Sequence, residues 1–107
     1  MPHTLVQLEG DTQENFETWD TTIRDFLGMQ ALGVFLDSHI PEPDAGDWRL
    51  SEIYRVSRGV ARYAVLRTLE RPHIQQRLLS HGWDHTNLSP KYHYDFALEL
   101  WGHLMPA

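Results

Sequence analysis

The sequence predicts an all-α fold, a compact bundle of about five helices in one domain spanning residues 1–107. Two observations predict it. Apolar residues recur at steps of three and four along several segments, which is the spacing of one face of an α-helix, and prolines or glycines separate those segments. No segment alternates apolar and polar residues as a half-buried β-strand does. A hydrophobic content of 41% and a charged content of 22% are typical of a chain that folds around a core.

Two helices are expected in the first third of the chain. Residues 1–11 are predicted to be an extended lead-in, and the first helix to begin near Asn15, a good N-cap residue. Gly28 is expected to end or bend this helix, and a short second helix is expected over residues 29–36. Residues 37–47 contain two prolines and a glycine and are predicted to be a Pro-rich loop.

The third and longest helix is predicted from Trp48 to Glu70, with Asp47 as its N-cap. Gly59 interrupts it and indicates either a close contact with another helix or a bend. Its apolar positions recur at helical spacing: Leu50, Ile53, Val56, Val60, Ala61, Ala64, Val65 and Leu69.

Prolines delimit the last two predicted helices. The residue before a proline disfavours helical geometry, so the long helix should stop before Pro72, which can begin a fourth helix carrying Ile74 and Leu78. Residues 81–88 are predicted to be a loop. Ser89 and Pro90 are a strong start signal for a fifth helix, with serine as N-cap and proline in the first helical position.

The core is predicted from the apolar stripes of these helices. Each tryptophan can bury roughly 200 Å², so Trp19 and Trp101 should dominate the core of so short a chain. The residues expected to be mostly buried and in mutual contact are Phe16, Trp19, Ile23, Phe26, Ile53, Val60, Ala64, Phe96, Leu100 and Trp101.

The order of four sequence elements, from Leu8 to Leu104, resembles the N-terminal part of the Gag polyprotein of copia-type LTR retrotransposons. That family has a Leu-x-Gly element, an Asn-aromatic-x-x-Trp helix, an apolar-Pro-x-Pro joint and a later Ala-x-Glu-x-Trp-x-x-Leu helix. Here the elements read Leu8-Glu9-Gly10, Asn15-Phe16-Glu17-Thr18-Trp19, Ile40-Pro41-Glu42-Pro43 and Ala97-Leu98-Glu99-Leu100-Trp101-Gly102-His103-Leu104. Three residues, 11–13, appear as an extension between the first two elements.

The resemblance implies a helical capsid-like lobe whose function is structural. Such a lobe would associate with copies of itself through particle or lattice contacts, either in a retrotransposon or in a host protein derived from one. The family's Gag proteins continue beyond this helix, so a chain ending at Ala107 is expected to be one lobe, a trimmed chain or a host derivative. RNA packaging is expected only through regions outside this chain. The alternative function is a helical adaptor that does not assemble and binds a protein partner through its arginines or an apolar groove.

Charge is distributed unevenly along the chain. Residues 1–48 carry a net charge of −9, residues 49–77 carry +5, and the whole chain carries −6. Either the acidic and basic segments pair within one fold, or oppositely charged surfaces of neighbouring copies meet. The candidate interaction residues are the arginines of the long helix, which either pair with nearby acids such as Glu52 or bind a carboxylate-rich or phosphate-rich partner. They are Arg55, Arg58, Arg62 and Arg67.

The sequence favours neither an enzyme nor a metal protein. It contains no cysteine, no Gly-x-Ser-x-Gly elbow and no phosphate-binding glycine-lysine loop. His81, His85 and His93 lack the spacing of a zinc site, so no metal and no cofactor are expected. The start of the chain lacks signal-peptide features and no apolar run is long enough to span a membrane, which favours a cytoplasmic, intracellular protein without membrane contact.

Overall fold

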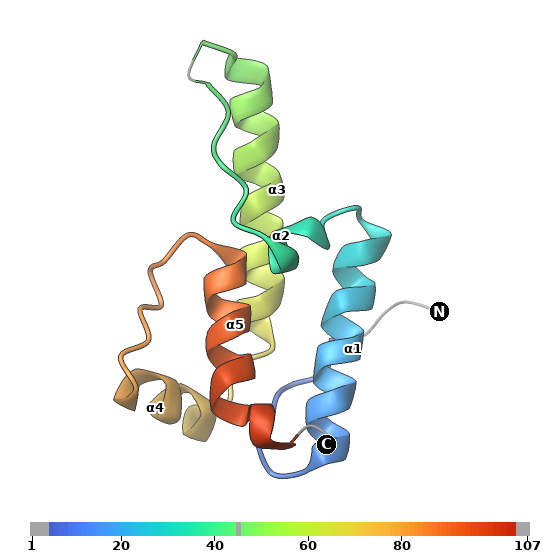
Figure 1. The fold of residues 1–107 in the computed structure, drawn as a ribbon, viewed down its shortest axis with the longest axis vertical. Coiled ribbons are helices and arrows are strands. Elements are labelled where there is room, and N and C mark those ends of the chain that lie inside the picture. The colour runs from blue at the N-terminus through green and yellow to red at the C-terminus, as the bar shows by residue number, and fades with distance from the viewer. Residues whose placement is uncertain (1–4, 45, 105–107) are drawn as a thin grey trace.

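The computed structural model describes residues 5–44 and 46–104, and within them the chain forms five α-helices, a final 3₁₀ turn and no β-strand. The prediction of an all-α fold is therefore confirmed. Figure 1 shows α1, α5 and the second half of α3 side by side, with α4 beneath α5, while the first half of α3 projects away from them. The elements are α1 (Gln13–Met29), α2 (Val34–Asp37), α3 (Trp48–Arg67), α4 (Pro72–Ser80), α5 (Pro90–Trp101) and η1 (Gly102–Leu104).

Local capping explains where three of the helices begin. The Asp47 side chain accepts a hydrogen bond of 3.1 Å from the Leu50 amide, and α3 begins at Trp48 as predicted. Ser89 caps α5 in the same way, and Pro90 occupies its first turn. Pro72 begins α4, also as predicted.

The start of α1 differs from the prediction. Thr12 is the N-cap, because its hydroxyl accepts from the Asn15 amide at 3.1 Å, and the helix begins at Gln13. The Asn15 side chain instead holds the lead-in against the helix: its amide donates to the Gln7 carbonyl at 3.0 Å and its oxygen accepts from the Glu9 amide at 2.8 Å.

The predicted helix over residues 29–36 is also wrong. Helix α1 continues through Gly28 to Met29, and the chain then turns with Ala31 in the left-handed region at a φ of 58°. A residue in that conformation cannot continue a right-handed helix. Only one helical turn, α2, follows, and Asp37 belongs to it rather than to the loop.

The core forms where α1, α3 and α5 meet. Trp19 is fully buried, its indole N–H donates to the Thr68 hydroxyl at 2.8 Å, and its ring stacks on Tyr94 with centroids 5.7 Å apart. Of the residues predicted to be core, Phe16, Trp19, Ile23, Ala64 and Trp101 are buried, while Phe26, Phe96 and Leu100 are half-buried against them.

The lead-in before α1 packs against this core and contacts both the residue after α3 and the end of α5. Leu8 is fully buried, and its amide donates to the Thr68 carbonyl at 2.9 Å. Gly10 lies at a φ of 73°, and a Cβ atom there would lie 2.5 Å from the Trp101 indole nitrogen. Only glycine therefore fits at this position without a shift of Trp101.

The prediction that Ile53 and Val60 belong to the core is wrong. Ile53 is 63% exposed, because α1 and α5 pack beside only the second half of α3. Val60 is 38% exposed because it lies in the second half but on the side away from the buried Ala61 and Val65. Gly59 does not mark a close helix contact either, since a Cβ atom built on it would meet nothing within 4 Å.

His93 is a buried polar residue with both ring nitrogens hydrogen-bonded. Its Nδ1 accepts from the Trp83 indole at 2.8 Å, and its Nε2 lies 2.7 Å from the Asn87 carbonyl, to which it must donate. This arrangement requires a neutral ring. Burial lowers the pKa of His93, outweighing the Asn87 hydrogen bond that opposes the shift, and the positive charge of Arg62 lowers it further.

We predict opposite outcomes for two tryptophan substitutions. Trp101→Ala should lower the free energy of unfolding by roughly 3–5 kcal/mol, because it opens a cavity in the core. Trp48→Ala, at the exposed start of α3, should change it by less than about 0.5 kcal/mol. Urea unfolding followed by circular dichroism measures both, and similar losses in the two variants would contradict this description of the core.

We also predict that acid destabilises the fold through His93. Because the pKa of His93 is lower in the folded than in the unfolded chain, the unfolded chain binds more protons below the ordinary value of 6.5. The stabilisation should be fully present above pH 6.5 and be lost as the pH falls through the folded pKa, with a slope of at most about 1.4 kcal/mol per pH unit. His93→Gln should flatten this part of the pH dependence, whereas the exposed control His103→Gln should not, since His103 is not among the groups that shift the pKa of His93. Equal slopes in all three proteins would contradict the assignment.

Candidate protein-interaction surface

An exposed apolar stripe runs along α3. Ile53, Val56, Val60 and Tyr63 follow one another at steps of three, four and three residues, which places them on one side of the helix. Their exposed fractions are 63%, 62%, 38% and 63%, and Leu50 beside them is 53% exposed. We call these five residues the α3 apolar face.

The opposite side of α3 makes contact with the rest of the molecule. Ser51, Ala61 and Val65 are buried there. Tyr54 is half-buried, and its hydroxyl donates to the Ile40 carbonyl at 2.6 Å, so the chain before α3 runs back along the first half of the helix. Helix α3 is therefore apolar on two sides, and only one of them is covered.

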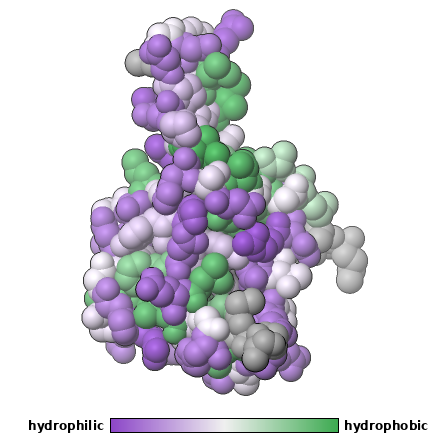
Figure 2. Space-filling model, viewed as in Figure 1, coloured by the Kyte–Doolittle hydropathy of each residue, from purple (hydrophilic) through white to green (hydrophobic). Residues whose placement is uncertain are grey.

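The space-filling view shows the same surface from outside. Figure 2 shows hydrophobic surface along one side of the projecting part of the molecule and again on the shoulder below it. Trp48, at the tip of α3, is 68% exposed, and Met29 and Val34 are exposed where α1 ends and α2 begins. Extended apolar surface of this kind on a small domain marks an interaction site more often than single exposed apolar residues do.

The four arginines of α3 that were predicted as candidate interaction residues all have partners within the chain. Arg55 forms an ion pair with Glu42 at 3.2 Å, and Arg58 lies 3.9 Å from the same carboxylate with its guanidinium over the Tyr54 ring. Arg67 pairs with Glu70 at 3.0 Å. These acids are Glu42 and Glu70 rather than the predicted Glu52.

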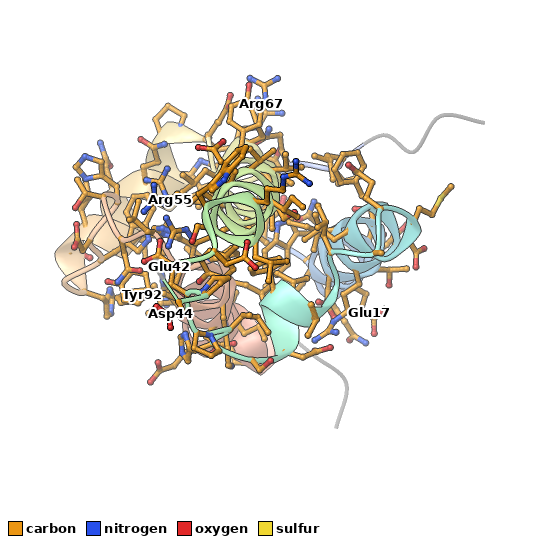
Figure 3. All side chains as sticks on the ribbon, turned by 90° about the horizontal axis from the view of Figure 1, so that it is seen from above. Glu17, Glu42, Asp44, Arg55, Arg67 and Tyr92 are labelled. Carbon is orange, nitrogen blue, oxygen red and sulfur yellow. The ribbon has the colours of Figure 1, made fainter. Side chains whose placement is uncertain are left out.

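Arg62 has a structural role. Its guanidinium donates to the backbone carbonyls of Asn87 at 2.8 Å and His85 at 2.7 Å, and so holds the loop before α5 against α3. Figure 3, viewed along α3, shows Arg55 and Arg67 pointing from the helix in different directions, with Glu42 on the Arg55 side. Arg55, Arg58 and Arg62 follow one another at steps of three and four residues and so share one side of α3, whereas Arg67 lies on another side. All four are engaged by groups of the same chain and do not form a free basic surface.

Ion pairs also join the acidic and basic segments of the chain. Glu9 in the lead-in pairs with Arg71 at 2.8 Å, and Glu42 pairs with Arg55. The intramolecular pairing that the charge distribution suggested does therefore occur. Each of these pairs is solvent-exposed and is worth only about 0–1 kcal/mol.

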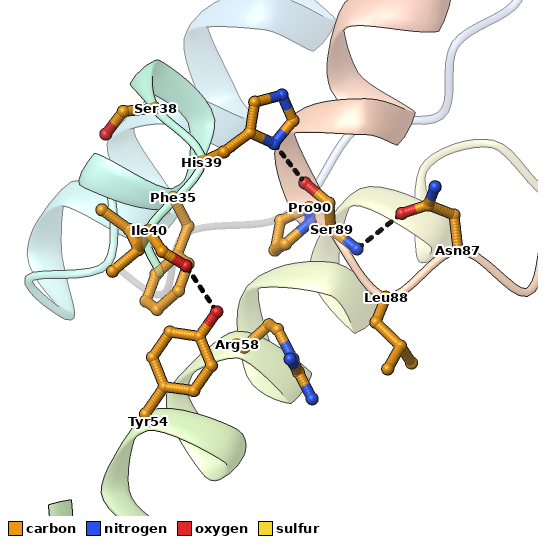
Figure 4. A pocket seen from close by; sticks show the side chains of 10 residues that line it. All are labelled: Phe35, Ser38, His39, Ile40, Tyr54, Arg58, Asn87, Leu88, Ser89 and Pro90. Atoms are coloured by element: carbon orange, nitrogen blue, oxygen red, sulfur yellow. Dashed lines mark hydrogen bonds between the residues drawn. The ribbon is translucent and has the colours of Figure 1, made fainter. Parts of the chain in front are cut away.

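A pocket of about 220 Å³ lies between α3, the chain after α2 and the start of α5. In the close view, His39 Nδ1 lies 3.0 Å from the Ser89 hydroxyl, and the Ser89 amide donates to the Asn87 side chain at 2.8 Å (Figure 4). Ser89 is also the N-cap of α5, which gives its hydroxyl a structural role. The pocket is smaller than the roughly 300–1,000 Å³ of typical small-molecule sites, and its size suits a single partner side chain.

The three histidines considered as metal ligands have other partners or are dispersed. His93 is held in the core, and His81 Nδ1 lies 2.9 Å from the Arg77 carbonyl. Within residues 5–44 and 46–104, no group of three or more acidic or histidine side chains is arranged to hold a metal ion. None of the helices in this part of the chain is long and apolar enough to cross a membrane.

Sequence reasoning identified the arginines and missed the α3 apolar face. A signal was present, because eight apolar positions recur in a segment that a single core face could not accommodate. Val56 and Val65 differ by nine residues and so lie about 180° apart around a helix with 3.6 residues per turn, too far for one apolar side to contain both. That excess of apolar residues indicates a helix with two contact faces.

No family model, no curated protein and no solved structure matches this chain.

Proposed function

We propose that this chain is a structural, self-associating domain of the Gag capsid kind. The single observation that carries the proposal is the α3 apolar face, which lies on a helix anchored at one end in the core and open along one side. A surface of this kind loses free energy when another molecule covers it. The domain offers a rigid contact surface, which is what a building block of an assembly needs.

The packing of the four Gag-like elements supports the proposal. Gly10 of the first element lies against Trp101 of the last, and Trp19 of the second is at the centre of the core. Ile40 of the Pro-containing joint accepts a hydrogen bond from Tyr54 and so connects the joint to α3. The residues that carry the resemblance are thus the ones that hold the lobe together, as expected for a capsid-like domain.

The second candidate function is a helical adaptor that binds one protein partner without assembling. The pocket beside α3 favours it, because Phe35 and Leu88 give it apolar walls and Arg58 adds a cation. An acidic or apolar side chain of a partner would fit there. As part of the Gag-like proposal, RNA packaging would be carried by regions outside this chain.

Self-association should be detectable in solution and should resist salt. A single copy has a radius of gyration of 14.4 Å. Small-angle scattering of the chain should give a larger value as the protein concentration rises, and the increase should persist at high ionic strength because apolar contacts are not screened.

The salt dependence separates two kinds of assembly. If copies met mainly through opposite charges, as the charge distribution alone suggests, high salt would restore the monomer value. A radius that stays at the monomer value at every concentration and salt would contradict self-association and favour the adaptor.

A further inference from the structure

We propose that a second copy of this chain covers the α3 apolar face, with the two α3 helices packed antiparallel across a two-fold axis close to Val56. This inference rests on the proposed self-association and names the contact that produces it. A two-fold interface uses the same surface on both copies, so the α3 apolar face must complement itself.

The spacing of the exposed residues fits an antiparallel pair. Positions 53, 56, 60 and 63 alternate by three and four, which is the spacing that keeps one seam of a helix against a partner helix. With the axis close to Val56, Ile53 of one copy lies level with Val60 of the other, and Leu50 lies level with Tyr63. Each apolar side chain then meets another apolar side chain.

The charges beyond the apolar seam favour the same orientation. In this register Arg67 of one copy comes level with the acidic start of the other copy's α3, where Asp44 and Asp47 lie. A parallel pair would instead place Arg67 beside Arg67 and Arg49 beside Arg49. Antiparallel helices also align their dipoles favourably.

The exposed area is of the size that a specific contact needs. The exposed parts of the α3 apolar face and Trp48 amount to roughly 700 Å² per copy, near the ~800 Å² per partner of a standard interface. Trp48 is at the tip of the projecting part of α3 (Figure 1). In the antiparallel pair Trp48 comes level with Val65 of the other copy, in the half of α3 that packs beside α1 and α5. The second copy would therefore bury part of the Trp48 side chain that is exposed in the monomer.

Engineered thiols test the proximity of the two copies. The chain contains no cysteine, so one introduced thiol gives an unambiguous cross-link. Val56→Cys should form a disulfide-linked dimer under mild oxidation, because two-fold pairing brings the two thiols together. Arg55→Cys, one residue away on another side of α3, is the matched control and should link several-fold more slowly. Equal rates would overturn the contact.

A mixed cross-link tests the orientation. When Ile53→Cys and Val60→Cys chains of different mass are combined, the antiparallel register predicts that the mixed dimer dominates. A predominance of the two homodimers would indicate parallel helices and would overturn the proposed geometry.

A charge-matched pair of variants separates this contact from self-association in general. Val56→Glu and Arg55→Gln each make the net charge more negative by one, and both positions are exposed, so both proteins should fold. Val56→Glu should weaken the dimer at least about tenfold, measured by sedimentation equilibrium, and Arg55→Gln should leave it nearly unchanged. If the parent chain associates and Val56→Glu associates equally well, the α3 contact is wrong while self-association stands. A parent chain that stays monomeric overturns both.

Discussion

The contact between Gly10 and Trp101 joins the two ends of the described chain, and the rest of the fold depends on it. Trp101 can lie where it does only because residue 10 has no side chain, and the left-handed backbone at Gly10 turns the lead-in toward α1. The same lead-in places Leu8 over the end of α3, where its amide binds the Thr68 carbonyl. Thr68 in turn receives the Trp19 indole N–H through its hydroxyl. One small set of contacts thus fixes α1, α3 and α5 relative to one another.

The features that could be predicted from the sequence are those with local causes. Asp47 and Ser89 begin helices because each side chain binds an amide three residues ahead, and that interaction is complete within a single turn. Pro72 and Pro90 begin helices for an equally local reason. The choice between Thr12 and Asn15 at the start of α1 was not local. Asn15 could have capped the helix, but its side chain binds the lead-in instead, a contact between segments that spacing does not reveal.

The largest difference between prediction and structure concerns α3, and it has a geometric cause. Periodicity shows which side of a helix is apolar and gives no information about how far the neighbouring helices extend. Among the described residues, helices α1 and α5 pack against the second half of α3, while its first half is accompanied by α2, through the Phe35 ring on Tyr54, and by the chain that follows α2, through Ile40 and Glu42. Ile53 has the spacing of a core residue and lacks a neighbour to bury it. The exposure of Ile53 and Val56 therefore follows from element lengths, which the residue pattern does not give, although the number of apolar positions on α3 did indicate a second apolar side.

The two apolar sides of α3 contribute to different processes. One side stabilises the folded monomer, and the other is available for the proposed association. Ala61 and Val65 contribute to stability because folding itself removes them from water. Ile53 and Val56 are mostly exposed in the monomer and therefore contribute little to the free energy of folding. Selection for a stable fold alone would not require these two residues to be apolar. An exposed isoleucine or valine costs solubility and provides no core packing. Their regular spacing on an anchored helix supports the proposed contact with a second copy. In that proposal the arginines, which are largely engaged with Glu42, Glu70 and loop carbonyls, orient the contact rather than drive it.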